Sequence, residues 1–418
     1  MNARQRLQAT LNHEAPDRVC VDFGATNVSG IAVSTLRKLR KAVLGEESGP
    51  VKIAEPFLML GEVDDELRRA LSVDVRGVFG RRGRFGVAAK GWKEFELFDG
   101  TEVLAPDWFT PTVDTNGDWL LHPGADPSAP PSARMPRGGF YFDAIIRQMP
   151  IDDRHLDPRD NLEEFGLYSA EDIEHFAAQT RQAAAAGWGV VISPPGLSFG
   201  DVSHVPGVAL ARPRGIRDVE EWYVSLLTRP DYIYSVFEGQ CQIALRNLAS
   251  LAKAVGDNAD VIFVTGTDFG SQRGPLVSPK VYRELFKPFH KEINAFVHAN
   301  TPWKTFIHSC GAVVDLIPDF IEAGFDILNP VQTSAAGMDP ATLKREFGHQ
   351  IVFWGGGVDT QKTLPFGAPE EVYREVRERI DILGDGGGFV FNSVHCVQAN
   401  TPVENMLAVF KAVRDASC

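Results

Sequence analysis

The second half of this chain alternates short apolar runs with longer helical patterns, and this alternation limits the possible folds more than any other feature. From about residue 187 onward the apolar runs cover residues 189–193, 260–265, 304–308, 326–329, 351–354 and 388–394. The helical patterns between and after them cover residues 229–255, 278–299, 313–323, 340–347, 369–383 and the segment that begins at 401–402. Five or six strand–helix units in a row predict a parallel sheet joined by crossover helices. With 418 residues, an α/β chain of this regularity favours a (β/α)8 TIM barrel over an open sheet, and we expect residues 1–418 to form one barrel domain.

The first half of the chain is less regular. A strand is expected at 18–23 and helices at 36–43 and 64–71, whereas residues 85–143 have the character of a β-rich insertion over one end of the barrel. Two hairpin turns are expected in that insertion, at Asp99-Gly100 and at Asn116-Gly117. Its segment 126–136 is rich in Pro, Ala and Ser, which predicts a loop.

Composition narrows the class of protein. The content of 44% hydrophobic and 23% charged residues is that of a soluble globular protein. A formal net charge of −13 argues against a nucleic-acid-binding surface and against binding to an anionic membrane. The first residues lack the apolar core of a signal peptide, and no run reaches the ~18 apolar residues that span a bilayer. We therefore expect a cytoplasmic protein.

The five cysteines do not form the pattern of a disulfide framework, because they are odd in number and widely spaced. Cys20 lies in a short strand pattern and Cys241 in an apolar helical pattern, so both are expected to be packed, and Cys418 is the last residue, where fraying is expected. Cys310 and Cys396 both follow strand-like runs and are the candidates for chemistry.

The run at 304–308 ends in His308-Ser309-Cys310-Gly311. Residues i and i+2 of an extended strand point to the same side, so His308 and Cys310 can converge at the carboxyl end of the strand, where a barrel keeps its active site. An imidazole and a thiolate favour Zn²⁺, and a catalytic zinc takes three protein ligands and keeps one position open. The third ligand is His395 or Cys396, which as neighbours on a strand face opposite ways. The alternative for the pair is a core histidine beside an inert thiol.

Polar residues follow five consecutive strand patterns of the second half, from 260–265 onward. Besides the residues just named, they are Asp268, Gln272, Asn329, Gln332, Asp359, Gln361 and Asn392. Barrel enzymes build their sites from strand ends in this way, although helix capping or loop hydrogen bonding can explain any single one of these residues. Of the two Gly-rich runs, 355–357 lies at a strand end, where a backbone can approach a ligand closely, and 386–388 is expected to be a turn.

Several of these stretches resemble the uroporphyrinogen decarboxylase superfamily. They are His-Ser-Cys-Gly at 308–311, Asn-Pro-Val-Gln at 329–332, Trp-Gly-Gly-Gly-Val-Asp at 354–359 and Thr-Pro-Val-Glu-Asn at 401–405. Within the superfamily the chain is most similar to the corrinoid-linked methyltransferase branch. The resemblance implies a (β/α)8 barrel with zinc at its mouth, held by a His-x-Cys pair and a distant Cys. The third place falls on His395, with Cys396 one residue later, and we rank His395 first.

True porphyrinogen decarboxylases carry an arginine-containing segment near the start that pairs with the carboxylates of the substrate. The corresponding residues 21–30 contain no arginine here. A substrate with many carboxylates needs such cationic partners, so this chain is a poor candidate for that substrate.

The hypothesis from the sequence is therefore a zinc-dependent methyltransferase. It would move a methyl group between a small methylated substrate (a methoxylated compound, a methylamine or a thiol) and a corrinoid cofactor, carried by a partner protein. The expected catalytic residues are Asp268, Asp359 and Gln332, and the expected substrate-binding residues are Gln272, Asn329, Gln361 and Asn392. The alternatives are a lyase that decarboxylates a smaller acid, a zinc hydrolase, and a non-catalytic zinc- or corrinoid-binding protein. The oligomeric state stays open, with a homodimer as one alternative.

Overall fold

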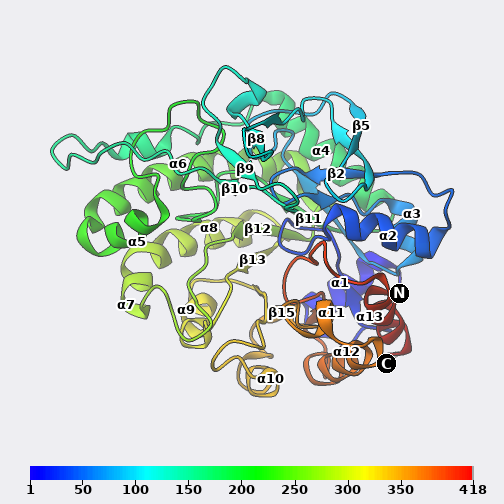
Figure 1. Ribbon diagram of the computed structural model, residues 1–418. Coiled ribbons are helices and arrows are strands. Elements are labelled where there is room, and N and C mark those ends of the chain that lie inside the picture. Colours follow the sequence, from blue (N-terminus) through cyan, green and yellow to red (C-terminus); the bar gives the residue numbers. More distant parts are fainter. Residues whose placement is uncertain (417–418) are drawn as a thin grey trace.

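In the computed structural model, which describes residues 1–416, eight parallel strands form a nearly closed barrel surrounded by helices (Figure 1). In chain order the barrel strands are β1 (Cys20–Val21), β4 (Val75–Phe79), β11 (Gly189–Ser193), β12 (Val261–Thr265), β13 (Lys304–His308), β14 (Ile327–Asn329), β15 (Val352–Trp354) and β16 (Phe389–Phe391). At the remaining seam, between β1 and β4, the amide of Asp74 donates to the carbonyl of Val21 (2.8 Å). The predicted (β/α)8 TIM barrel is confirmed.

The barrel interior is packed with apolar side chains. Every strand contributes to a single buried cluster, which contains Cys20, Val75, Val191, Val261, Phe306, Ile327, Val352, Trp354 and Val390. Leu7 and Leu11 of helix α1 (Ala3–Leu11) belong to the same cluster, so this helix covers the amino ends of the strands. A functional site must therefore lie at the carboxyl ends.

Helices cover the outside of the barrel. Most of them begin at a capping residue or have a proline in their first turn. They are α2 (Val33–Leu44), α3 (Asp65–Ala70), α4 (Ala170–Ala185), α5 (Val219–Thr228), α6 (Pro230–Val255), α7 (Pro279–Val281), α8 (Lys287–Asn300), α9 (Ile317–Glu322), α10 (Pro340–Phe347), α11 (Thr363–Phe366), α12 (Pro369–Leu383) and α13 (Val403–Asp415). A π-helical turn, Tyr282–Phe286, joins α7 to α8. Proline stands in the first turn of α6, α10 and α12, where its missing N–H costs no hydrogen bond. Among residues 1–416, no helix is long and apolar enough to cross a membrane.

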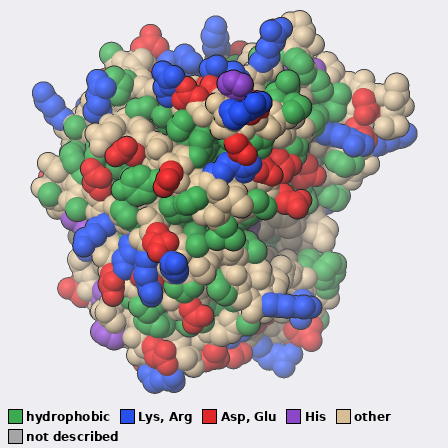
Figure 2. Space-filling view, turned by 90° about the vertical axis from the view of Figure 1, so that its left-hand side faces the viewer, with side chains coloured by type: hydrophobic (Ala, Val, Ile, Leu, Met, Phe, Trp, Pro, Cys, Tyr) green, Lys and Arg blue, Asp and Glu red, His purple; other side chains and the backbone are tan. Residues whose placement is uncertain are grey.

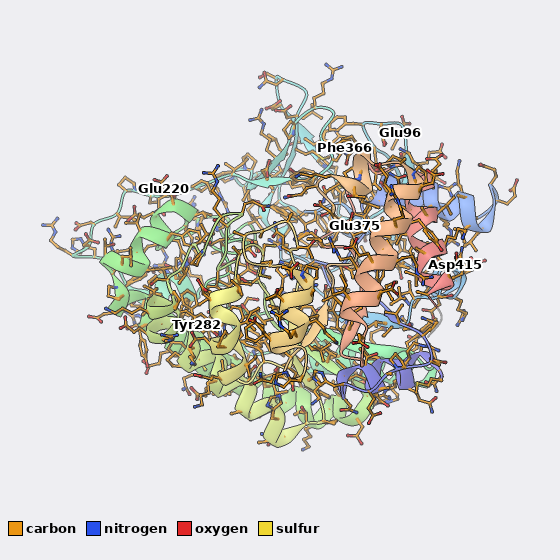
Figure 3. All side chains as sticks on the ribbon, turned by 90° about the horizontal axis from the view of Figure 1, so that it is seen from below. Glu96, Glu220, Tyr282, Phe366, Glu375 and Asp415 are labelled. Carbon is orange, nitrogen blue, oxygen red and sulfur yellow. The ribbon has the colours of Figure 1, made fainter. Side chains whose placement is uncertain are left out.

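The outer helices are joined by polar contacts as well as by apolar packing. Figure 3 labels Glu375 on α12 and Asp415 on α13, and these two helices lie side by side. The hydroxyl of Tyr373, also on α12, donates to the Asp415 carboxylate (3.0 Å). On the face shown in Figure 2, acidic and basic side chains are interspersed instead of separated by sign.

Two small sheets lie outside the barrel. One has the order β10–β9–β8–β7 and the other β3–β2–β6–β5. Their strands are β2 (Val51–Glu55), β3 (Leu60–Gly61), β5 (Trp92–Glu96), β6 (Glu102–Pro106), β7 (Thr112–Val113), β8 (Trp119–Leu121), β9 (Ala133–Met135) and β10 (Asp143–Ala144). Both predicted hairpin turns are present, with Gly100 and Gly117 in the left-handed region (φ +76° and +84°).

One sequence-based expectation for this region is wrong, and one sheet extends beyond it. Segment 126–136, expected to be a loop, ends in strand β9, because Ala133 and Met135 are buried around an exposed Arg134 and pair with β8. In addition, the second sheet includes β2 and β3, which precede residue 85 in the chain, because β2 pairs in parallel with β6.

Candidate metal centre at the carboxyl ends of the strands

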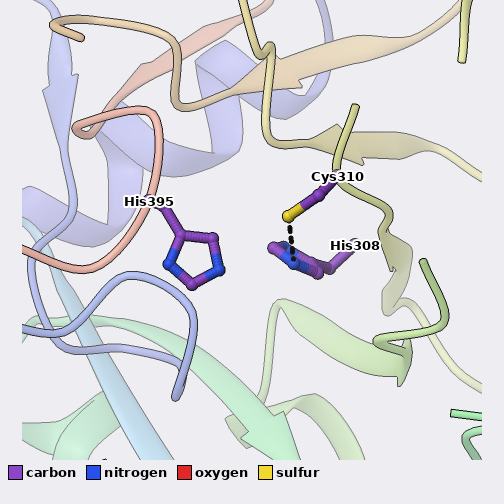
Figure 4. A group of neighbouring side chains, drawn as sticks. All are labelled: His308, Cys310 and His395. Atoms are coloured by element: carbon purple, nitrogen blue, oxygen red, sulfur yellow. Dashed lines mark hydrogen bonds between the residues drawn. The ribbon is translucent and has the colours of Figure 1, made fainter. Parts of the chain in front are cut away.

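Three potential metal ligands converge at the mouth of the barrel (Figure 4). His308 is the last residue of β13, Cys310 follows two residues later, and His395 lies in the loop after β16. Their ligand atoms all lie within 4.8 Å of one another. His308 Nε2 is 3.3 Å from Cys310 Sγ, and the two imidazole rings meet edge to face with centroids 5.4 Å apart. The structure thus brings together two nitrogens and one sulfur from three chain positions.

Cys396, the alternative third ligand, faces another way. Its side chain is buried, and its thiol donates to the carbonyl of Asn27 in the loop after β1 (3.1 Å). Burial raises the pKa of Cys396 to about 12. The chain bends at residues 394 and 395, and the imidazole of His395 reaches the group of ligands while the thiol of Cys396 reaches the neighbouring loop.

The two histidines are already in the protonation state that ligates a metal, whereas Cys310 must lose its proton. Burial lowers the pKa of His308 to about 4 and that of His395 to about 4, so both imidazoles are neutral at neutral pH. Burial, assisted by the nearby Asp268, raises the pKa of the Cys310 thiol well above its usual range. A divalent cation favours the thiolate and reverses this shift. Two imidazoles and one thiolate are a zinc-type set with a fourth position left over, so the residues present fit Zn²⁺.

Asp268 lies beside these ligands. It follows β12, and its Oδ1 accepts a hydrogen bond from the backbone amide of Cys310 (2.7 Å) and lies 3.8 Å from His308 Nε2. Burial raises the pKa of the Asp268 carboxyl, although about a third of the side chain (36%) is exposed. This position next to the donors and within reach of a ligand suits a group that gives or takes a proton.

Three other predicted residues lie within the wall of the site. Gln332 is buried, and its Oε1 accepts a hydrogen bond from the amide of Gly311 (2.7 Å). Asn329 is buried between His308 and strand β15. Asn392 donates from Nδ2 to the carbonyl of Asp22 (2.7 Å). These contacts hold neighbouring strand ends together.

The remaining predicted residues bond to each other or to their own loop. Asp359 Oδ1 accepts hydrogen bonds from the amides of Gln361 (2.6 Å) and Lys362 (3.0 Å), which is the loop-bonding alternative considered from the sequence. Gln272 Nε2 donates to Gln361 Oε1 (3.2 Å), and both glutamine side chains are exposed.

Sequence analysis missed three residues near the site. Asp22 is fully buried below the mouth, where its Oδ2 accepts a hydrogen bond from Trp354 Nε1 (2.9 Å). Asp201, in the segment after β11, is buried, and its charge helps to raise the pKa of Asp268. Tyr223 of α5 donates to the Asp268 carbonyl (3.1 Å). Asp201 could have been found by extending the strand-end argument to β11, whereas a helical tyrosine carries no such signal.

Comparisons with known proteins show which family part of this chain resembles. The family model for uroporphyrinogen decarboxylase (URO-D) matches residues 212–416. A uroporphyrinogen decarboxylase from Mannheimia succiniciproducens is 27% identical over 132 residues, which are 31% of this chain and 34% of that protein. A methylated-thiol–coenzyme M methyltransferase from Methanosarcina mazei is 26% identical over 167 residues, or 38% of each chain. The chain thus matches only about a third to a half of the length of these curated relatives.

A solved structure extends the agreement in fold to the whole chain. A methyltransferase from Methanosarcina mazei superposes with a TM-score of 0.55 and 14% sequence identity, covering 99% of both chains. At this identity the likeness concerns the barrel fold alone. The resemblance predicted from the sequence is confirmed: residues 212–416 match the uroporphyrinogen decarboxylase family model, and the whole chain shares the barrel fold of this methyltransferase.

Proposed function

We propose that this protein is a zinc-dependent methyltransferase that moves a methyl group between a small methylated substrate and a corrinoid carried by a partner protein. The observation that carries the proposal is the convergence of His308, Cys310 and His395, with ligand atoms within 4.8 Å at the carboxyl ends of the barrel strands. The similarity to a curated methyltransferase supports the same class of reaction.

Methyl transfer from an oxygen, nitrogen or sulfur atom is slow because the departing group is poor. A bound zinc ion supplies a Lewis acid that stabilises the negative charge of that group. The chain's own residues prepare the site for it. The neutral imidazoles of His308 and His395 offer lone pairs, and Cys310 must give up its thiol proton before its sulfur can ligate.

Asp268 is the residue that we assign to proton transfer. Burial raises the pKa of this carboxyl, so it takes up a proton more readily than an exposed aspartate does, and it can give that proton to the departing atom when the methyl group leaves. Its hydrogen bond to the Cys310 amide holds the carboxyl at the mouth while Gln332 fixes the next amide of the same turn, that of Gly311. The wall of the site is thereby held in place before substrate arrives.

Among the three substrate classes expected from the sequence, we favour a methylated thiol, because the methyltransferase relative is named for one. A small thioether needs no set of cationic partners. The lack of arginine in residues 21–30, next to the mouth, is consistent with such a substrate.

The test is a corrinoid methylation assay. Zinc-loaded protein is mixed with a Co(I) corrinoid and a panel of methylated thiols, methoxylated aromatics and methylamines, and the conversion of Co(I) to methyl-Co(III) is followed by absorption. We expect turnover with at least one class and none with the Cys310→Ser variant. If no class methylates the corrinoid, or if the variant matches the wild type, the proposal is wrong.

A second candidate is decarboxylation of a carboxylic acid smaller than a porphyrinogen. It is favoured by the family model and by the relatives named uroporphyrinogen decarboxylase. This activity would release CO₂ with no corrinoid present, so an assay for CO₂ from a panel of small acids separates the two candidates.

A further inference from the structure

The side chain of Asn329 connects three neighbouring strands at the mouth of the barrel. It stands at the end of β14, in register with His308 on β13. Its Oδ1 lies 2.5 Å from His308 Nδ1, and its Nδ2 donates to the carbonyl of Trp354 on β15 (2.8 Å). The side chain is 1% exposed, so water does not compete for either contact.

These contacts determine the orientation of the amide. A backbone carbonyl can only accept a hydrogen bond, so the carbonyl of Trp354 requires the NH₂ group of Asn329 on its side. The amide oxygen then faces His308, and since an oxygen of this kind cannot donate, the proton of this hydrogen bond must belong to His308 Nδ1.

We propose that Asn329 is a positioning residue that holds His308 in the tautomer with its proton on Nδ1, so that Nε2 presents a lone pair to the metal. The distance of 3.3 Å from His308 Nε2 to Cys310 Sγ agrees with this assignment, because in the metal-free protein the thiol can donate to that lone pair. The role in zinc binding rests on the proposed function, whereas the tautomer does not. This assignment replaces the substrate-binding role expected for Asn329, whose polar atoms are both engaged within the protein.

The Gly-rich run at 355–357 gives independent support. Gly355 has φ +90°, and a Cβ at this position would lie 3.0 Å from Asn329 Nδ2 and 3.1 Å from the carbonyl of Ser393. The absence of a side chain leaves the space that the amide of Asn329 occupies. The first glycine of this run thus serves the amide that orients His308.

The tautomer can be tested in the metal-free protein. We would record ¹⁵N–¹H correlation spectra of the histidine rings, and assign His308 among the ten histidines by the signals missing in His308→Gln. The wild type is expected to show a protonated Nδ1 and an unprotonated Nε2 on His308. In Asn329→Leu, which has no acceptor, that pattern should be lost. Asn329→Asp keeps an oxygen opposite Nδ1 and should retain the pattern.

Zinc affinity is the second measurement, made by competition with a chromophoric chelator. Loss of the partner of a ligating histidine typically weakens metal binding about 10- to 100-fold, and we expect this loss in Asn329→Leu. The matched control is Asn405→Leu on the outer helix α13. Asn405 is equally buried (1%), and its Nδ2 also donates to backbone carbonyls, those of Leu364 and Gly367. Its replacement should leave zinc affinity and the His308 signals unchanged.

The outcomes separate the two proposals. A wild-type His308 that carries its proton on Nε2 would overturn the role of Asn329, and so would an Asn329→Leu variant with wild-type signals and wild-type zinc affinity. If Asn329→Leu fails to fold, the wild-type spectrum and Asn329→Asp still decide the tautomer. A wild type with the expected tautomer that binds no zinc would refute the proposed function and leave the tautomer assignment standing.

Discussion

The backbone amide of Cys310 donates a 2.7 Å hydrogen bond to the carboxylate of Asp268, and this bond joins the chain segments that follow β12 and β13. The bond places the Asp268 carboxyl 3.8 Å from His308 Nε2. A group that can carry a proton is therefore held next to the metal ligands by a contact that does not depend on the metal.

The variant Asp268→Asn separates the two roles of this carboxyl, which are to accept the hydrogen bond from Cys310 and to transfer a proton. The amide oxygen of asparagine can still accept the hydrogen bond from Cys310, so zinc content and stability should stay close to those of the wild type. Proton transfer by a positioned side chain typically contributes 10²- to 10⁴-fold, so we expect kcat to fall by about 10²-fold or more. The measurement is steady-state methylation of the corrinoid together with metal analysis. A variant with wild-type kcat would assign Asp268 to positioning alone.

The identity of the third ligand gives a second prediction. His395 belongs to the converging group, whereas the thiol of Cys396 bonds to the Asn27 carbonyl. We expect His395→Ala to lose zinc or to bind it much more weakly, and Cys396→Ser to keep it, because a hydroxyl can make the same bond to Asn27. Metal content after dialysis against a weak chelator measures both. Retention of zinc by His395→Ala, with loss in Cys396→Ser, would reverse our ranking.

The barrel could be predicted from the sequence because strand patterns and helical patterns alternate regularly in the second half of the chain. Strands at 261–265 and 304–308 and the helix at 230–255 lie where the apolar patterns place them. Helix α4 was missed, although Ser169 and Asp172 form a capping box, and β1 is only two residues long where six were expected. Short strands at the barrel seam are fixed by tertiary contacts, such as the bond from Asp74 to Val21, which no local pattern reveals.

The site could be predicted only in part. The i, i+2 spacing brought His308 and Cys310 to one side, but the choice between His395 and Cys396 depends on a bend of the chain that follows from packing. The role expected for Asp359 stays a prediction, because aspartates that bond to their own loop and catalytic aspartates both follow strands. The contact between Asp22 and Trp354 joins residues 332 positions apart and is visible only in the folded chain.

The seam between β1 and β4 gives a third prediction. A Cβ on Gly77 of β4 would lie 2.3 Å from the carbonyl oxygen of Ala25, so Gly77→Ala must push the two backbones apart. Overpacking of this kind typically costs about 1–3 kcal/mol, and we expect a loss of that size in the free energy of unfolding. Gly91→Ala is the control, because its Cβ would meet nothing within 4 Å, and its unfolding should stay within about 0.5 kcal/mol of the wild type. Equal denaturation midpoints for the two variants would contradict the prediction.

The fourth prediction concerns the pH dependence of stability and rests on Asp22. Burial raises the pKa of this carboxyl from 3.8 to about 6, although hydrogen bonds from Ser29, Ala25 and Trp354 oppose the shift. Between these two pKa values the folded state binds more protons than the unfolded state, so stability falls as pH rises. Asp22→Asn cannot ionise and lacks this slope. Relative to the variant, the wild type should lose about 2 kcal/mol of unfolding free energy between pH 4.5 and pH 7.5.

Urea denaturation of both proteins at the two pH values measures this difference, and Asp319→Asn serves as the control. Burial would raise the pKa of Asp319, but hydrogen bonds from Arg283 and Lys287 outweigh it and hold that pKa below its ordinary value. Its contribution to stability is therefore complete above about pH 4 and is lost only at lower pH. The difference in unfolding free energy between the wild type and Asp319→Asn should stay constant from pH 4.5 to pH 7.5. The corresponding difference between the wild type and Asp22→Asn should change. If both differences in unfolding free energy stay constant, Asp22 is ionised throughout this range in the folded protein, and the hydrogen bonds around it compensate for its burial.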